Sequence, residues 1–204
     1  MVVKGKVEAE VKPPIEATKA IVYDLPSENQ LKFRDSKVKQ RVRNVRVWST
    51  MLLHRLGVLC TESVILVPES RVKEIEATVK KVFKMYQDLN KDLLKDVNVG
   101  IDEPLIKVID LTTKQTEDLK TLAERKLRER LDQAIERIAN LLNEMDNIIE
   151  ESKRKRLVYN LNKQTKEYER LEKLAKELGL ETNHKFELLT ELMNQAISTL
   201  KEGL

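Results

Sequence analysis

One long stretch of the chain contains neither glycine nor proline, and it constrains the fold more than any other feature. This stretch runs for 74 residues, from Leu105 to Leu178, whereas glycines and prolines recur throughout the residues before it. Both residue types destabilise helix interiors, so their absence over this length favours long helices. We therefore expect two differently built domains, an α+β domain at residues 1–112 and a helical domain at residues 113–204.

The first domain alternates short apolar runs with amphipathic stretches. Apolar residues spaced by three and four predict two helices, one capped by Ser36 and one capped by Ser70. Alternating or continuous apolar runs predict strands at residues 3–12, 20–25, 58–67 (kinked near Thr61 and Glu62) and 105–111. The resulting order of elements favours an α+β sandwich in which the helices pack on one sheet.

Two apolar seams in the second domain lie on nearly opposite sides of a continuous helix. One seam runs from Leu127 to Ile148 and the other from Leu157 to Leu178. A single straight helix would have to change faces, so we expect a helical hairpin that turns near residues 152–156. A third helix is expected after Gly179, which suits the position that follows a helix end.

The first of these seams is wider than a contact between two helices needs. Ile135, Leu142 and Ile149 extend it beyond the residues of the heptad pattern. A monomer would leave this apolar surface exposed. We therefore expect a homodimer, or a protein partner that binds through the helices of residues 113–204.

Positive charge is concentrated in one short window. Residues 31–56 contain eight Lys and Arg residues but a single anion, Asp35, so the window carries +7 and the rest of the chain −3. Clustered cations favour a polyanion such as the DNA or RNA backbone, because each neutralised phosphate releases condensed counterions. The candidate phosphate-contacting residues are Lys39, Arg41, Arg43 and Arg46. A solvated helix face, or a contact with an acidic partner, is the alternative explanation of this pattern.

Three segments of the first domain resemble a known module. They are Tyr23-Asp24-Leu25-Pro26-Ser27-Glu28, the end of the basic helix at Leu53-His54-Arg55-Leu56-Gly57, and Glu62-Ser63-Val64-Ile65-Leu66-Val67-Pro68. Over residues 20–111 this pattern resembles the ferredoxin-like module of the small CRISPR-adaptation nuclease family, and also that of the phenylacetate-degradation repressors and chromate-resistance regulators. The resemblance implies a ferredoxin-like fold in a nucleic-acid-associated, dimerising module.

The nuclease branch of this resemblance also implies a metal site. Asp24 would then be a ligand of a divalent metal ion, shared with its counterpart across a two-fold axis. The alternative is that Asp24 accepts hydrogen bonds from turn amides before Pro26, a role that aspartate commonly takes.

The chain lacks the residue sets that common catalytic and cofactor sites require. The single cysteine, Cys60, excludes a multi-thiolate metal site, and five scattered glycines cannot form a phosphate-binding loop. His54 and His184 have no partner at the spacing of metal ligands. We expect no cofactor and no enzyme activity, with Cys60 and the only tryptophan, Trp48, in the core. No apolar run is long enough for a membrane span or a signal peptide, so we expect a cytoplasmic protein without membrane contact.

Together these patterns predict a non-catalytic nucleic-acid-binding protein of a regulatory or accessory kind, in which the basic helix contacts phosphates. A structural or assembly protein that acts through its helical domain is one alternative. A metal-dependent nuclease is another.

Overall fold

The computed structural model describes residues 19–30, 35–144 and 150–202, so the strand expected at residues 3–12 lies outside the described part. The strands in this part are β1 (Lys19–Asp24), β2 (Val58–Thr61), β3 (Val64–Val67) and β4 (Leu105–Asp110). The helices are α1 (Ser36–His54), α2 (Val72–Val97), α3 (Thr113–Glu144), α4 (Glu151–Glu177) and α5 (Lys185–Glu202), with short 3-10 turns at Glu28–Gln30 and Glu69–Arg71.

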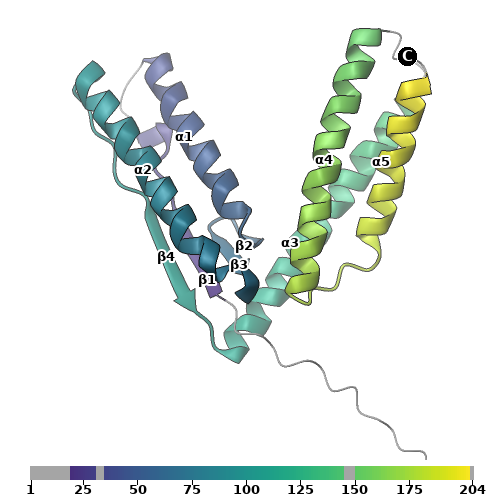
Figure 1. Ribbon diagram of the computed structural model, residues 1–204, viewed down its shortest axis with the longest axis horizontal. Coiled ribbons are helices and arrows are strands. Elements are labelled where there is room, and N and C mark those ends of the chain that lie inside the picture. Colours follow the sequence, from purple (N-terminus) through teal and green to yellow (C-terminus); the bar gives the residue numbers. More distant parts are fainter. Residues whose placement is uncertain (1–18, 31–34, 145–149, 203–204) are drawn as a thin grey trace, which may run out of the picture.

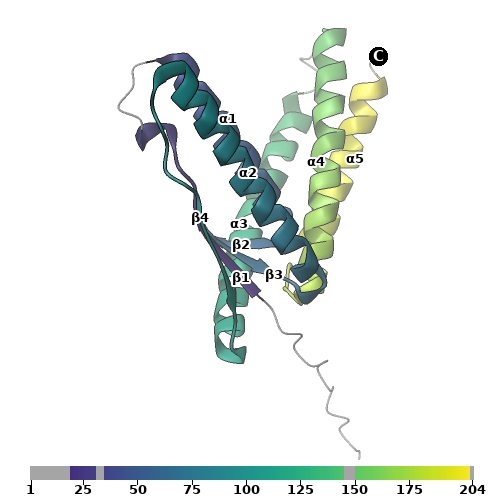
Figure 2. The same cartoon turned by 60° about the vertical axis from the view of Figure 1, so that its left-hand side comes forward.

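The four strands form one antiparallel sheet in the order β2-β3-β1-β4. Helices α1 and α2 lie side by side and pack on one face of this sheet (Figures 1 and 2). This strand order, with the connectivity β-α-β-β-α-β, is that of a ferredoxin-like sandwich, so the expected fold class is confirmed. Residues 58–67 form the β2–β3 hairpin and not one kinked strand, because Glu62 and Ser63 make a turn between two antiparallel partners.

Gly57 separates α1 from β2 at a point where the backbone passes very close to β3. A Cβ atom at this position would lie 2.0 Å from the carbonyl oxygen of Leu66. Only glycine fits there without a shift of the backbone. The glycine therefore allows β2 to begin directly after the helix and to pair with β3.

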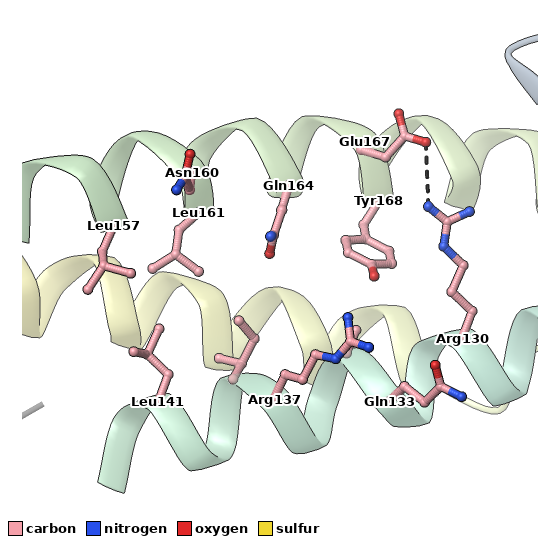
Figure 3. Close-up of a pocket in the computed structure, with 12 residues that line it drawn as sticks. Arg130, Gln133, Arg137, Leu141, Leu157, Asn160, Leu161, Gln164, Glu167 and Tyr168 are labelled. Carbon is pink, nitrogen blue, oxygen red and sulfur yellow. Dashed lines mark ion pairs between the residues drawn. The ribbon is translucent and has the colours of Figure 1, made fainter. Parts of the chain in front are cut away.

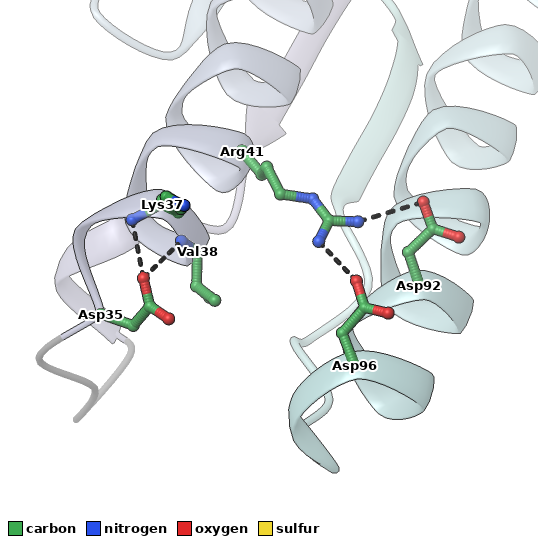
Figure 4. Close-up of polar contacts among 6 residues, drawn as sticks. All are labelled: Asp35, Lys37, Val38, Arg41, Asp92 and Asp96. Atoms are coloured by element: carbon green, nitrogen blue, oxygen red, sulfur yellow. Dashed lines mark hydrogen bonds and ion pairs between the residues drawn. The ribbon is translucent and has the colours of Figure 1, made fainter.

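Neither helix of the sandwich is capped by the serine that we expected. The Asp35 carboxylate, and not Ser36, caps α1 by accepting hydrogen bonds from two backbone amides of the first turn at 2.8 and 3.3 Å (Figure 4). Ser70 lies in the short turn before α2, and its hydroxyl donates to the Glu177 carboxylate of α4 at 2.9 Å. Ser70 thus joins the sandwich to the helical domain instead of capping α2.

The helical domain consists of α3, α4 and α5, and α5 packs against both of the other helices. The expected hairpin of α3 and α4 is present, but α4 begins at Glu151, so residues 152–156 belong to its first turns and not to the turn between the helices. Gly179 follows α4 with a φ of 62°, and the Leu180 amide donates to the carbonyl oxygen of Ala175 at 2.9 Å. This is the Schellman arrangement, and it ends α4 where the sequence predicts.

The helical domain shares a hydrophobic core with the sheet. Helix α3 crosses the sheet on the face opposite to α1 and α2, where Leu127 packs in one buried cluster with Val58, Cys60 and Leu66 of the β2–β3 hairpin. The same cluster continues through α4 and α5. Residues on both sides of the expected boundary at 112/113 therefore contribute to one core.

Much of the apolar seam from Leu127 to Ile148 is covered within the protomer. Leu127, Leu131, Ala134 and Ile138 are buried in the shared cluster, and Ile135 and Leu142 are half-buried against it. Ile149 lies outside the described residues. The seam is wide because α3 packs both against the sheet and against the other two helices of its domain. The homodimer stays a prediction.

Charged residues occur along the whole length of the helical domain. The longest helix, α3, has 32 residues and many Lys, Arg and Glu side chains. Among the helices that the structure describes, none combines the length and the apolar character needed to cross a membrane.

Candidate nucleic-acid interface

A cleft is lined by the C-terminal end of α1 and by residues of α3 and α4. The sandwich and the helical domain meet at an angle there, and α1 and α4 are the two facing arms of a V (Figure 1). Both helices run toward its narrow end. There the Arg170 guanidinium of α4 donates to the carbonyl oxygens of His54 and Arg55, both at 3.2 Å. The last carbonyls of a helix have no intrahelical partner, so Arg170 caps the C-terminus of α1 and fixes the narrow end of the cleft.

Glu167 orients Arg170 from the preceding turn of α4. Its carboxylate accepts two hydrogen bonds from Arg170, at 2.8 and 3.4 Å, and also forms an ion pair of 3.7 Å with Arg130 of α3. The Arg130 guanidinium lies 5.8 Å from the centre of the Tyr168 ring, within the range of a cation–π contact. One carboxylate thus holds two arginines and joins α3 to α4 and, through Arg170, to α1.

The cleft at this junction has a volume of about 740 Å³ and is strongly cationic. Among the described residues, Glu167 is the only carboxylate that lines it. The cationic residues of the lining are Arg55, Arg130, Lys163, Lys166 and Arg170. Within the described part of the chain, the exposed residues Arg55, Lys163 and Lys166 form no ion pair. The cleft therefore has a surplus of positive charge that faces solvent.

A second hollow, of about 590 Å³, adjoins the cleft and shares Met51 and His54 with it. Arg43 and Arg46 of α1 line this hollow. The acidic residues around it are Asp24, Glu28 and Glu62. Charges of both signs face this hollow, in contrast to the cationic cleft.

His54 and Tyr23 form a hydrogen-bonded pair between the two hollows. The Tyr23 hydroxyl donates to the carbonyl oxygen of Glu62 at 2.9 Å and lies 2.7 Å from His54 Nε2. A hydroxyl carries one proton, so Nε2 is the donor to the tyrosine oxygen. Burial, followed by the charges of Arg130 and Arg170, lowers the pKa of His54, and burial raises the pKa of Tyr23. At neutral pH His54 is therefore uncharged and adds nothing to the charge of the cleft.

A groove of about 630 Å³ continues from the cleft between α3 and α4 (Figure 3). Its polar end shares Arg130 and Gln164 with the cleft and adds Arg137 of α3. Its other end is apolar and is lined by Leu141, Leu157 and Leu161. The polar end extends the cationic surface of the cleft onto α3.

The four residues predicted to contact phosphates do not lie together. Arg41 forms ion pairs of 3.2 and 2.7 Å with two aspartates of α2 (Figure 4), so it joins the two helices of the sandwich. Lys39 is half-buried and lines neither hollow. Arg43 and Arg46 are exposed and line the second hollow. The structure thus argues against Arg41 as a phosphate contact and places Arg43 and Arg46 beside the cleft.

The cations of α4 that line the cleft are not among the predicted phosphate contacts. From Thr113 onward the chain has as many acidic as basic residues, so no excess of charge marks this region. The spacing of Lys163, Lys166 and Arg170 by three and four residues is the signal that could have found them, because it places all three on one helix face.

Trp48 is exposed on α1, so the expectation of a buried tryptophan is wrong. Its exposed fraction is 59%, and those of Val47 and Met51 are 50% and 41%. Ser49 is fully buried and marks the side of α1 that faces the core. The residue before it is turned away from that side by about 100°. Cys60 is buried as expected, and burial raises the pKa of its thiol to about 11.

Asp24 is exposed at the end of β1 and lines the second hollow. In residues 19–30, 35–144 and 150–202, no group of three or more His, Cys, Asp or Glu residues could hold a metal ion. The metal site implied for Asp24 requires a second copy of the chain across a two-fold axis. Metal binding by Asp24 therefore stays a prediction.

Comparison with family models, with curated proteins and with solved structures gives no match for this chain. The resemblance of residues 20–111 to nucleic-acid-associated modules therefore rests on the segments quoted for it.

Proposed function

We propose that this protein binds the phosphate backbone of nucleic acid in the cleft between α1 and α4, as a non-catalytic regulatory or accessory protein. The observation that carries the proposal is the convergence of five Lys and Arg residues on a cleft whose described lining has a single carboxylate. Because these residues come from α1, α3 and α4, the folded chain, and not one basic helix, creates the charge surplus.

The exposed cations of the cleft suit a polyanion. Glu167 is occupied by Arg170 and Arg130, so it leaves Lys163 and Lys166 without a counter-charge among the described residues. Cations held together at a concave surface raise the local potential and attract anions. Their contact with phosphates then releases the counterions condensed on the nucleic acid, which favours binding at low salt.

The surface next to the cleft provides further contacts along a bound chain. Arg137 extends the cationic residues along α3. Arg43 and Arg46 lie farther along α1, in the hollow that Asp24, Glu28 and Glu62 also line. A strand in the cleft would therefore touch both domains. This arrangement favours binding of a backbone over binding of a single small anion.

The test removes two charges from the cleft and compares this with an equal change elsewhere. In Lys163→Gln with Lys166→Gln, we expect weaker nucleic-acid binding and a salt dependence flatter by about 0.7 to 0.9 units of slope for each lost contact. The matched control is Lys81→Gln with Lys84→Gln, two exposed lysines of α2 at the same spacing. Fluorescence anisotropy with a labelled oligonucleotide over a salt series measures both quantities.

We expect the control variant to bind like the unaltered protein. Equal binding by both double variants would contradict the proposal, as would the absence of binding by the unaltered protein at low salt. Either result would favour a structural or assembly role through the helical domain.

A further inference from the structure

Two exposed aromatic side chains lie on α1 and α4, the helices on the two sides of the cleft. Trp48 of α1 is 59% exposed and Tyr159 of α4 is 69% exposed, although large aromatic side chains usually contribute to a core. On α1 the apolar residues Val47 and Met51 adjoin the tryptophan and are also exposed. Both rings therefore lie in solvent, on the two helices that also carry cations of the cleft.

Each ring lies on the same helix face as the residues of the cleft. On α4, Tyr159, Lys163, Lys166 and Arg170 follow one another at spacings of four, three and four residues, and the last three line the cleft. On α1, Trp48 precedes Met51 and Arg55, which both line the cleft, by three and seven residues. Arg170 marks the narrow end, so both rings lie toward the open end of the V.

We infer that the nucleic acid bound in this cleft is single-stranded, with unpaired bases stacked on Trp48 and Tyr159 while its phosphates contact Lys163, Lys166 and Arg55. This inference rests on the proposed function and specifies its ligand. Bases within a duplex are already stacked on one another and present only their edges, so they cannot cover an aromatic face. Exposed aromatic rings within a cationic groove are the combination by which proteins bind single strands.

Stacking and charge contribute in different ways, and the difference can be measured. Removal of a ring lowers affinity but leaves the number of neutralised phosphates unchanged, so the salt slope stays the same. Removal of a lysine changes both affinity and slope. Trp48 is the only tryptophan in the chain, so its fluorescence reports directly on stacking at this position.

The experiment uses the full chain with a DNA strand of mixed sequence of about 20 nucleotides, longer than the ~4–16 nucleotides that a single-strand module covers, and with the same strand in a duplex. We expect tighter binding of the single strand and quenching of the tryptophan fluorescence. Trp48→Leu and Tyr159→Leu should each weaken single-strand binding about tenfold with an unchanged salt slope. Trp48→Phe should retain most of the affinity, and Leu94→Ala, at an exposed position of α2, is the matched control.

The outcomes separate this inference from the proposed function. If the duplex binds at least as tightly, or if Trp48→Leu binds the single strand like the unaltered protein, the inference fails while the charge-dependent binding of the cleft still stands. If neither form of DNA binds at low salt, the proposed function fails as well, and the exposed patch around Trp48 becomes a surface for a protein partner. Because both rings are exposed, the variants should fold normally, which their melting temperatures will check.

Discussion

The guanidinium of Arg170 donates to the carbonyl oxygen of His54, 116 residues earlier in the chain. This contact places α4 against the end of α1 and so determines where the two arms of the cleft meet. Glu167 keeps the guanidinium in position from the neighbouring turn.

Arg170→Gln should therefore weaken the junction. The change removes charge-assisted hydrogen bonds to the His54 and Arg55 carbonyls, so we expect a loss of about 1–3 kcal/mol in the free energy of unfolding. Urea denaturation followed by circular dichroism measures the loss. Lys173→Gln, at an exposed position of the same helix, is the control and should leave the stability unchanged. Equal stability of the two variants would show that Arg170 does not support the junction.

Arg41 and Arg43 should respond differently to the same substitution. Arg41 is engaged by Asp92 and Asp96, whereas Arg43 is exposed beside the cleft. Arg43→Gln should weaken nucleic-acid binding and flatten its salt dependence by about 0.7 to 0.9 units of slope. Arg41→Gln should leave binding unchanged and slightly lower the melting temperature. A larger loss of binding for Arg41→Gln than for Arg43→Gln would reverse this assignment.

His54 should make the stability of the protein depend on pH. Its pKa is lowered in the folded state, so the unfolded chain binds the proton more readily. The stability contributed by neutral His54 is complete above the unfolded pKa of about 6.5 and is lost as the pH falls through the lower folded pKa. His54→Gln should reduce the loss of stability between pH values of about 7 and 5. Urea denaturation at each pH, for the unaltered protein and for His54→Gln, measures this difference.

The mass of the protein in solution tests the predicted homodimer. If two copies associate through the helical domain, light scattering at micromolar concentration should give twice the mass of one 23.7 kDa chain. Leu141→Glu, in the apolar end of the groove, should shift the protein toward monomer. Leu188→Glu, at an exposed position of α5, should not. A mass of one chain for the unaltered protein would contradict the dimer.

A substitution of Asp24 tests nucleic-acid binding and catalysis separately. We expect no cleavage of DNA or RNA by the purified protein with magnesium or manganese, and we expect Asp24→Asn to bind nucleic acid like the unaltered protein. Electrophoresis of labelled substrates provides the readout. Metal-dependent cleavage that disappears in Asp24→Asn would instead establish the nuclease function.

Most of the fold could be predicted from the sequence, because the sequence signals that specify its elements are local. Gly57 and Gly179 each mark the break that follows a helix, and the apolar spacing of each helix records the side that it buries. The sequence alone does not distinguish Asp35 from Ser36 as the cap of α1, because both are good capping residues. The β2–β3 turn has only two residues, so in the sequence it resembles a kink within one strand.

Less of the candidate site could be predicted from the sequence, because the site depends on contacts between residues far apart in the chain. The ion pairs of Arg41 reach residues more than fifty positions away, and nothing near Arg41 in the sequence indicates them. The cleft exists only because α4 lies opposite α1, and the contact that sets this position spans more than a hundred residues. Charge density along the chain therefore identified the basic helix but not the opposite wall.

The packing of α3 against the β2–β3 hairpin also bears on how the cleft would respond to a ligand. A cleft between two separately folded domains can open and close, and a ligand must then halt that motion at a cost in entropy. Here Leu127 of α3 and Leu66 of β3 lie in the same buried cluster, so a change in the angle between the arms would expose apolar surface to water. We therefore expect the two walls to keep their separation whether or not nucleic acid is bound, so the width of a ligand would limit its binding.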